Sequence, residues 1–513
     1  MTNNPVILAI DEGTSGTRAA TVSADGHVSC LEYQTLHVET PRPGVVEQDA
    51  NEILEKTISV CRATIAQAQR AGQQIAAVAL ATQRATAVLW DTRTGAALVP
   101  AMVWQDTRYV DELDQLAPDW DARLLDRVGR PVGVRSLYLW AARHLRDTPQ
   151  VGQAWREKRL AFGTVDSWLL WHFSQRREVV TTPTNATSSG AYVLADHRYY
   201  LEWVQELDFP FELLPALRQD ADDFGQTRPE VLGIEVPILA SAGDQHAGAI
   251  GLGCLDRGQA MCVHGTGSFV DLIIGPEPPV NSGLSEGSLT MTARRQDGVS
   301  HFAVETFVAT TGSALNWVCE KLKWFADARE ISALAATVVA SQGVTFVPAL
   351  TGLRVPQMEA AARASLTGVS MATTQAEVAY AILEGIAHSV TSCIEADEAV
   401  SGVRVSELVV GGGLSCSDPL LQIQADLIGI PIRRMQESDR ASLRGIAYLA
   451  GSSGLLWPSL HAACKTIATD AVFQPAIDAA ERARRRALWH ARVGSELGHV
   501  RQFKQEKEEA LHK

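Results

Sequence analysis

The chain alternates two patterns of hydrophobic and polar residues. Short apolar runs of strand length are followed by longer segments whose apolar residues recur at the spacing of an amphipathic helix. We predict strands at 6–10, 74–81, 237–242, 259–264, 344–350 and 408–410, and helices at 48–70, 306–323, 377–400 and 415–427. Strands that alternate with helices in this way predict an α/β protein.

The first strand leads into a turn that could bind phosphate. Asp11 ends the apolar run, and residues 13–17 form a turn rich in glycine and hydroxyl groups before a return strand that begins at Arg18. A carboxylate beside such a turn can hold a metal-bound polyphosphate, because the glycines let the backbone approach and the donors bind oxygens. An ordinary hairpin would have the same pattern. A second turn of this kind, at 264–269, favours the phosphate interpretation.

The second half of the chain repeats the strand–turn–strand plan of the first. A chain of 513 residues also exceeds what one hydrophobic core normally holds. We therefore predict two α/β domains that face each other over a cleft. The expected boundaries are 1–250 and 251–490, followed by a charged helical tail at 491–513.

Polar residues follow several predicted strands, where the ligands of α/β proteins usually bind. Residues 82–86 follow the second buried strand, although a solvated loop would look the same. Trp104 stands beside Gln, Asp and Arg, which together can give a polyol an apolar wall and hydrogen bonds. A lone Trp is more often part of a core.

Asp244 is the candidate catalytic group. It follows an apolar run that ends in small residues, at the junction of a strand with a Gly/Ala-rich helix that can pack closely against a neighbour. A carboxylate at such a junction suits a general base, and the alternative is a helix N-cap. The glycines at 411–413, between a strand and a helix, could let a flat nucleotide lie against the backbone or could form a flexible joint.

Composition excludes several classes of partner. The net charge of −14 and the pI near 5.4 argue against binding to nucleic acid or to an anionic membrane. No apolar run has the length of a membrane span, and the first apolar run is a strand, not a signal peptide. The eight cysteines form no CxxC pair, which is typical of reduced thiols in the cytoplasm.

Nine short stretches, in order along nearly the whole chain, resemble the FGGY family of carbohydrate kinases, and among its members most closely the glycerol kinases. They are IDEGTSGTR (10–18), ATQRAT (81–86), VWQDTR (103–108), FGTVDSWL (162–169), AGDQHA (242–247), HGTGSF (264–269), PALTGL (348–353), ASLTGV (364–369) and VVGGG (409–413). Each stretch is weak by itself, and the ordered set is specific.

The resemblance implies a two-domain fold of the actin and hexokinase type (ribonuclease H-like), with a five-stranded sheet in each half. ATP would bind mainly to the C-terminal half, and the acceptor alcohol to the N-terminal half. It also implies a cytoplasmic homo-oligomer, a dimer or tetramer, that uses ATP and Mg²⁺ and binds a small polyol or sugar. The alternative from another class is a non-catalytic, ATP-binding relative.

The resemblance also implies roles for individual residues. Asp244 would be the catalytic base, and Asp11 would bind the magnesium. Phosphates would contact Thr14, Ser15 and Arg18, while Thr266, Gly312, Gly412 and Gly413 would line the nucleotide. The acceptor would contact Gln83, Arg84, Asp244 and Gln245, with Trp104 and Phe269 as apolar walls.

Three positions depart from the glycerol-kinase pattern. Ala85 stands where those kinases have Glu, Arg135 aligns with a Tyr, and Ser417 replaces an Asn. The first two changes shift the acceptor pocket by about two positive charges and should leave space the size of a side chain. We therefore expect either a glycerol-like acceptor or a larger one: a pentulose, a four- or five-carbon polyol, or an aldonate.

Overall fold

The computed structural model describes residues 4–279 and 287–511, with side chains up to residue 506. Its first sheet has five strands. The strand Asn4–Gly13 (β1) is central because residues 6–10 are fully buried, so both of its faces need covering. The spatial order is β14 (Ile238–Gly243), β6 (Gln73–Thr82), β1, β2 (Gly16–Ser23) and β3 (Val28–Thr35).

The second sheet repeats this topology. In each sheet the first two strands of the half form an antiparallel hairpin, and the first strand also pairs in parallel with a later one. The order is β17 (Leu289–Gln296), β18 (Val299–Val308), β16 (Ser268–Gly275), β15 (Gln259–His264), β21 (Glu407–Gly411), β22 (Ile432–Met435) and β23 (Thr469–Phe473). The five middle strands match the first sheet, and β17 and β23 add two edge strands to the five expected.

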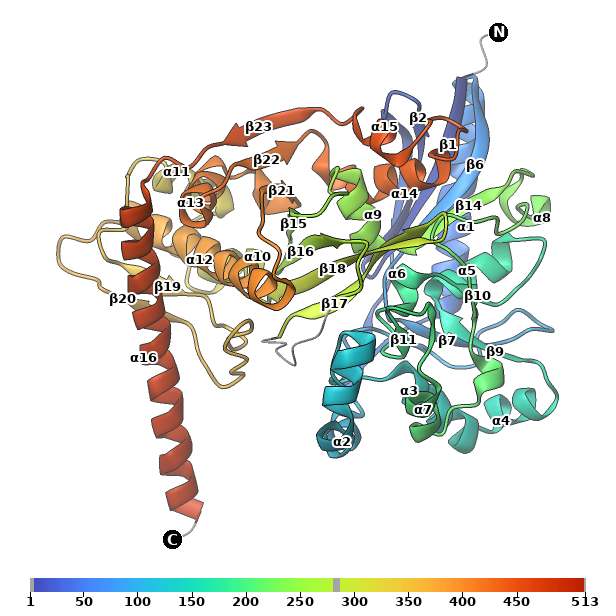
Figure 1. The fold of residues 1–513 in the computed structure, drawn as a ribbon, viewed down its shortest axis with the longest axis horizontal. Helices are drawn as coiled ribbons and strands as arrows, with labels where there is room; N and C mark the ends of the chain where they lie inside the picture. The colour runs from blue at the N-terminus through green and yellow to red at the C-terminus, as the bar shows by residue number, and fades with distance from the viewer. Residues whose placement is uncertain (1–3, 280–286, 512–513) are drawn as a thin grey trace.

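A third sheet and several helices form the outer part of the N-terminal half (Figure 1). The sheet has the order β4 (Glu39–Arg42), β5 (Val45–Gln48), β8 (Ala101–Met102), β7 (Ala87–Asp91) and β9 (Leu160–Thr164). The helices are α2 (Val110–Val128), α3 (Leu137–Asp147), α4 (Pro149–Arg156), α5 (Val165–Phe173), α6 (Pro183–Ala186), α7 (Leu201–Glu206) and α8 (Pro229–Leu232). Short strands lie among them and form two small sheets: β10 (Val180–Thr181) pairs with β13 (Ala216–Leu217), and β11 (Tyr192–Val193) pairs with β12 (Arg198–Tyr199).

Two helices cross at glycines near the first sheet. A methyl group added to Gly251 of α9 (Asp244–Gly251) would lie 1.8 Å from the carbonyl oxygen of Ala441, and one on Gly445 of α14 (Ala441–Gly451) would lie 1.8 Å from that of Ala247. The Gly/Ala-rich helix predicted after Asp244 therefore does pack at close approach. Figure 1 shows α14, from late in the chain, beside the strands of the first sheet.

The remaining helices cover the two main sheets. Helix α1 (Ala50–Arg70) follows the predicted span closely, and α12 (Gln375–Ser401) begins at a capping box. The helix predicted at 306–323 is wrong in its first part, because residues 306–308 end β18 and α10 (Gly312–Asn316) begins only at Gly312. The others are a π-helical segment (Trp317–Lys321), α11 (Ala328–Ala335), α13 (Asp418–Ile428) and α15 (Leu460–Cys464), with a small hairpin of β19 (Thr345–Val347) and β20 (Ser365–Thr367).

The last helix, α16 (Ala479–Leu511), is continuous and extends away from the body of the molecule at its far end (Figure 1). The helix begins before residue 491, where the charged helical tail was expected to start, and its first part packs against the body of the molecule. Trp489 and Val493 are each 3% exposed and pack with Val347. Further along, Phe503 is 66% exposed. None of the helices in the described part of the chain combines the length and apolar content of a membrane span.

Candidate active site

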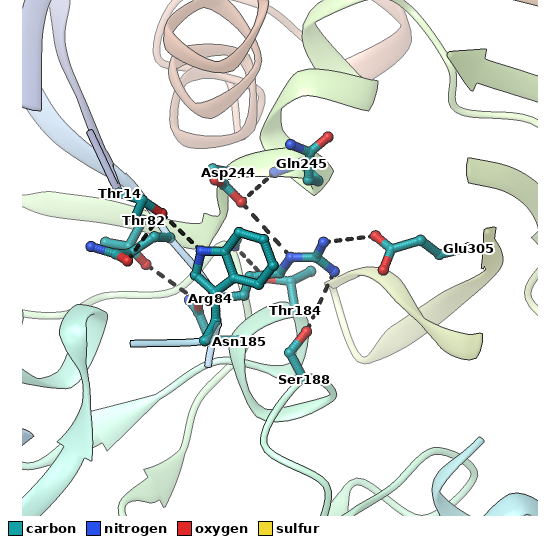
Figure 2. Close-up of polar contacts among 12 residues, drawn as sticks. Thr14, Thr82, Arg84, Thr184, Asn185, Ser188, Asp244, Gln245 and Glu305 are labelled. Carbon is teal, nitrogen blue, oxygen red and sulfur yellow. Dashed lines mark hydrogen bonds and ion pairs between the residues drawn. The ribbon is translucent and has the colours of Figure 1, made fainter. Parts of the chain in front are cut away.

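The candidate residues gather where parallel strands of the first sheet end. β1 and β14 both pair in parallel with β6, and Glu12 and Gly243 lie opposite the same residue, Thr82. The residues that follow or end these strands, Asp11, Arg84 and Asp244, therefore share one edge of the sheet. Figure 2 shows the resulting cluster of polar side chains.

The Asp11 carboxylate accepts hydrogen bonds from two residues in different parts of the chain. Arg18 Nε donates to Asp11 Oδ2 at 2.8 Å, and the Ser442 hydroxyl of α14 donates to the same oxygen. The described residues hold no cluster of three or more metal-ligating side chains. Magnesium in kinases commonly uses one or two carboxylates together with water and substrate phosphates. Asp11 supplies one carboxylate, and its Oδ1 accepts no hydrogen bond from the described residues. It therefore fits that requirement.

Thr14 is tied into a network with two predicted acceptor residues. Trp104 Nε1 donates to Thr14 Oγ1 at 2.9 Å, and that hydroxyl is 3.3 Å from Gln83 Oε1. Trp104 is partly exposed and hydrogen-bonded, and it also packs against a hydrophobic core cluster of the N-terminal half. Ser15, in the same turn, is exposed. The network fixes the turn that the sequence predicted to contact phosphates.

Gln83 is buried together with Glu12, a residue that the sequence analysis did not single out. Gln83 Nε2 donates to Glu12 Oε1 at 3.1 Å and to Gln48 Oε1 at 3.0 Å, so its amide is used within the protein. Glu12 is fully buried, and its Oε2 has no hydrogen-bond partner among the described residues. Burial raises the pKa of Glu12 well above its usual value, against the opposing bond from Gln83.

Arg84 lies between two carboxylates (Figure 2). Its guanidinium is 2.7 Å from Glu305 on β18 and 3.8 Å from Asp244 Oδ1, so it bridges the two halves of the molecule. It also lies 3.4 Å from the Ser188 hydroxyl. Glu305 was missed because the sequence analysis read residue 306 as the start of a helix. The signal was a single carboxylate within a strand-length apolar run, Phe302–Val308.

Asp244 has the properties of a base that functions near neutral pH. Burial raises the pKa of Asp244 to about 6, partly opposed by the charge of Arg84. Its side chain is still 28% exposed, so a ligand can reach it. Asp244 is the first residue of α9 while Gly243 is the N-cap, so the N-cap interpretation is wrong. The backbone N–H of Gln245 donates to Asp244 Oδ1 at 2.8 Å, which fixes the carboxylate.

An acidic pair and an aromatic pair face this cluster from the second sheet. Asp271 lies opposite Glu305, and Phe269 lies opposite Phe307, in the register of β16 with β18. Residues two apart on a strand share a face, so Phe269 lies on the face from which Glu305 reaches Arg84. The Phe269 and Phe307 rings stack with centroids 5.7 Å apart. Burial, reinforced by the charge of Glu305, raises the pKa of Asp271 well above its usual value.

The predicted nucleotide residues come together in the second half. The backbone N–H of Gly312 donates to Gly265 O at 3.1 Å, and a methyl group on Gly312 would lie 2.5 Å from that oxygen. Thr266, in the adjoining turn, is exposed. At Gly412 the chain's own backbone lies close by. A methyl group there would lie 2.3 Å from His264 O, so its missing Cβ makes room for the chain's own backbone. At Gly413, by contrast, an added methyl group would meet no described atom within 4 Å.

The three departures have distinct structural settings. Ala85 has a φ of 57° and is 1% exposed within an apolar cluster, so the predicted open space at this position is absent. Ser417 caps α13 and lies 2.6 Å from the Ser332 hydroxyl, which ties α11 to α13. Arg135 lies near Arg84, whose charge lowers the pKa of Arg135 together with the larger effect of burial. Tyr138 is buried and bonded to Ser189.

Two family models together match most of the chain. The model of the N-terminal domain of the FGGY family of carbohydrate kinases matches residues 6–251, and that of the C-terminal domain matches residues 260–454. The chain belongs to the FGGY family of carbohydrate kinases. It is therefore a kinase, a phosphotransferase that acts on an alcohol group.

Several glycerol kinases are similar to this FGGY kinase over nearly their whole length. That of Deinococcus radiodurans is 33% identical over 96% of this chain and 98% of its own, and that of Petrotoga mobilis is 33% identical over 95% and 97%. Solved structures share the fold. A glycerol kinase of Plasmodium falciparum with ADP has a TM-score of 0.90 at 24% identity, covering 96% of this chain and 99% of that one. A gluconate kinase of Lactobacillus acidophilus has a TM-score of 0.83 at 20% identity, covering 97% and 99%.

Proposed function

We propose that this kinase transfers the γ-phosphoryl group of ATP to a terminal hydroxyl of a polyol or sugar, with Asp244 as the general base. The observation that carries the proposal is the state of Asp244. It is reachable by ligand, its pKa is raised to about 6, and it lies beside Arg84 at the shared edge of the first sheet. A base with this pKa is ionised at pH 7 and can still accept a proton effectively.

The chemistry follows from these positions. Asp244 takes the proton of the acceptor hydroxyl as that oxygen attacks the γ-phosphorus, and the bond to the bridging oxygen breaks to release ADP. Arg84 and Gln245 orient the acceptor, with Trp104 and Phe269 as apolar walls. Asp11 would hold Mg²⁺, which neutralises phosphate charge when bound. Thr14, Ser15 and Arg18 belong to the turn that would approach the phosphates.

The proposal assigns the acceptor to residues 1–250 and the nucleotide to residues 251–490. Support comes from the exposed Thr266 turn, which adjoins Gly312, and from the open space at Gly413. The acceptor is a glycerol-like polyol or a larger polyol, ketose or aldonate, as the names of the relatives suggest: glycerol, xylulose and gluconate kinases.

We further propose a cytoplasmic homo-oligomer, either a dimer or a tetramer. All eight cysteines are free thiols, which agrees with a reducing compartment. Light scattering of the purified protein measures the oligomeric state, and a monomer at micromolar concentration would overturn this part of the proposal.

The role of Asp244 is tested by Asp244→Asn. The variant should bind ATP normally but lose a factor of roughly 10²–10⁴ in kcat, because the amide cannot accept the proton. The readout is acceptor-dependent ADP release over a panel of polyols, ketoses and aldonates. Asp119→Asn, an exposed position on α2, is the matched control and should keep full activity. An Asp244→Asn enzyme with most of its kcat would show that Asp244 is not the base.

A further inference from the structure

The loop that follows α2 carries two further arginines, Arg130 and Arg135, and the sequence analysis recognised only Arg135. Arg130, which follows α2, donates from Nη1 to the carbonyl oxygen of Ser188 at 3.2 Å, while Arg84 Nη1 lies 3.4 Å from the hydroxyl of the same serine. Two guanidinium groups thus meet at one residue of the candidate acceptor site. Arg135 lies at the other end of the same loop, directly before the N-cap of α3.

Arg130 is a buried cation with no carboxylate partner in the described part of the chain. Its side chain is 9% exposed, its Nε has no hydrogen-bond partner, and its recorded bond goes to a neutral carbonyl. Burial, together with the charge of Arg135, lowers the pKa of Arg130 to about 9. A buried charge without a counter-charge is costly, so this arrangement calls for an anion from elsewhere.

The Arg135 side chain makes no ion pair and no hydrogen bond with any described residue. Burial, with the charge of Arg84, lowers its pKa to about 10, yet the residue remains partly exposed. It immediately precedes Ser136, the N-cap of α3, so its backbone position is fixed by the helix start. A partly exposed cation next to a buried one can reach a ligand that enters the site.

The loop that carries both arginines is held in place by backbone contacts. The Thr290 N–H of β17 donates to Gly129 O at 2.8 Å, and a methyl group on Gly129 would lie 2.4 Å from Thr290 O. Val132 N donates to Asp121 Oδ1 at 2.8 Å. The backbone that carries the two arginines is therefore fixed before any ligand binds, which reduces the entropy that binding must overcome.

The two carboxylates nearest to Arg84 already face that guanidinium and do not pair with Arg130 or Arg135. Glu305 lies 2.7 Å from Arg84, and Asp244 is the second carboxylate near that guanidinium. Burial, together with the charge of Glu305 on the opposite strand, raises the pKa of Asp271 well above its usual value, which disfavours a negative charge there. Arg130 and Arg135 therefore add two positive charges to the site without adding a negative one. Guanidinium groups bind planar carboxylates through paired, charge-assisted hydrogen bonds.

We propose that the acceptor of this kinase is a sugar acid, whose carboxylate binds to Arg130 and Arg135 while its terminal hydroxyl meets Asp244. The inference rests on the proposed function and narrows its substrate class to aldonates and related polyhydroxy acids. A neutral alditol of the same length presents the same hydroxyls but leaves both arginines without a counter-charge. The charged group, and not the chain length, is what the site selects.

The test compares an aldonate with the alditol of equal carbon number, over four to six carbons, in the ADP-release assay with the whole enzyme. Wild type should show a kcat/KM for the aldonate about 10- to 100-fold higher, the range expected for hydrogen bonds to a charged group. Arg130→Gln and Arg135→Gln should reduce this ratio, mainly through the KM of the aldonate. Arg156→Gln, an exposed arginine on α4, is the control and should keep the ratio.

A second measurement reads binding without turnover. The aldonate should raise the thermal unfolding midpoint of wild type, and the alditol should raise it less. If Arg130→Gln fails to fold, Arg135→Gln and the wild-type ratio still decide the question. Equal or better turnover of alditols, a preference for a phosphorylated acceptor, or an unchanged ratio in a folded variant would overturn the inference and leave the kinase assignment intact. Absence of ADP release with every acceptor would instead overturn the proposed function.

Discussion

At the scale of single residues, Asp244 determines how the activity should depend on pH. Its pKa is raised to about 6, and the base must be deprotonated to accept a proton. We expect kcat/KM to be constant well above this pH and to fall about tenfold per pH unit well below it, because the deprotonated fraction of Asp244 then falls about tenfold per unit. The measurement is kcat/KM between pH 4.5 and 9 at constant ionic strength. A profile with no fall between pH 6.5 and 5 would contradict the assignment.

Glu12 gives a second pH-dependent prediction, in stability instead of activity. Its pKa is higher in the folded than in the unfolded chain, so the folded state holds the proton more tightly. The stability that this group gives is complete below its unfolded pKa and decreases as pH rises through the folded one. Glu12→Gln stays neutral, so the variant should gain stability relative to wild type as pH rises from 4.5 to 8.

Thermal unfolding midpoints of both proteins across that range test the prediction about Glu12. Glu202→Gln, at an exposed position on α7, is the control and should show a constant difference from wild type. A difference between Glu12→Gln and wild type that stays the same at every pH would mean that Glu12 is not held neutral by the fold.

Single residues could be located from the sequence where they end a strand. Asp11, Arg84 and Asp244 were predicted because each follows an apolar run, and the ends of parallel strands meet. Glu305 and Arg130 were not predicted. Their contacts with Arg84 and Ser188 join segments far apart in the chain, and local pattern carries no signal for such pairing.

At the scale of elements, the crossing of α9 and α14 positions Asp244. A methyl group on Gly445 would overlap the carbonyl oxygen of Ala247, so Gly445→Ala must push the two helices apart. We expect a loss of roughly 1–3 kcal/mol in the free energy of unfolding, the usual cost of overpacking, together with reduced kcat. Equilibrium unfolding in denaturant and the ADP-release assay measure the two effects.

The matched control for this crossing is Gly494→Ala on α16, where a methyl group would meet nothing within 4 Å. Alanine is the better helix former, so this change should be neutral or stabilise by about 0.5–1 kcal/mol. Equal effects of the two substitutions would contradict the role of the crossing. The sequence indicated a closely packed helix after Asp244, but no motif identified α14 as its partner.

Helix α16 is packed against the molecule near Trp489 and exposed to solvent near Phe503. Trp489 is 3% exposed and stacks on His388 with ring centroids 4.9 Å apart, whereas Phe503 is 66% exposed. Trp489→Ala should lower the free energy of unfolding by about 3–5 kcal/mol because it leaves a cavity. Phe503→Ala should change it by less than about 0.5 kcal/mol.

The same denaturant unfolding experiment decides between a packed and a solvated α16. A small effect of Trp489→Ala would support the solvated tail that composition alone suggests. The sequence misled here because the Arg- and Glu-rich stretch from residue 479 has no clean apolar stripe. Its buried Arg486 instead pairs with Glu395 and bonds to His388.

At the scale of the whole molecule, the chain consists of two halves built on the same strand topology and joined across the candidate site. The Arg84–Glu305 ion pair links β18 to the end of β6, and Ser442 of α14 bonds to Asp11. The repeat was predictable from the two similar turns at 13–17 and 264–268. The added edge strands β17 and β23 were not, because edge strands carry weaker apolar patterns.

The central claim is that these two halves carry out one phosphoryl transfer between ATP and a bound alcohol. The most direct test follows terminally labelled ATP in a single-turnover reaction with excess enzyme and a panel of polyols, ketoses and aldonates. The account predicts that label appears on an acceptor hydroxyl in a one-to-one ratio with ADP, and that the transfer is lost in Asp244→Asn. Label that remains on ATP, or that appears only as free phosphate whatever the acceptor, would contradict it.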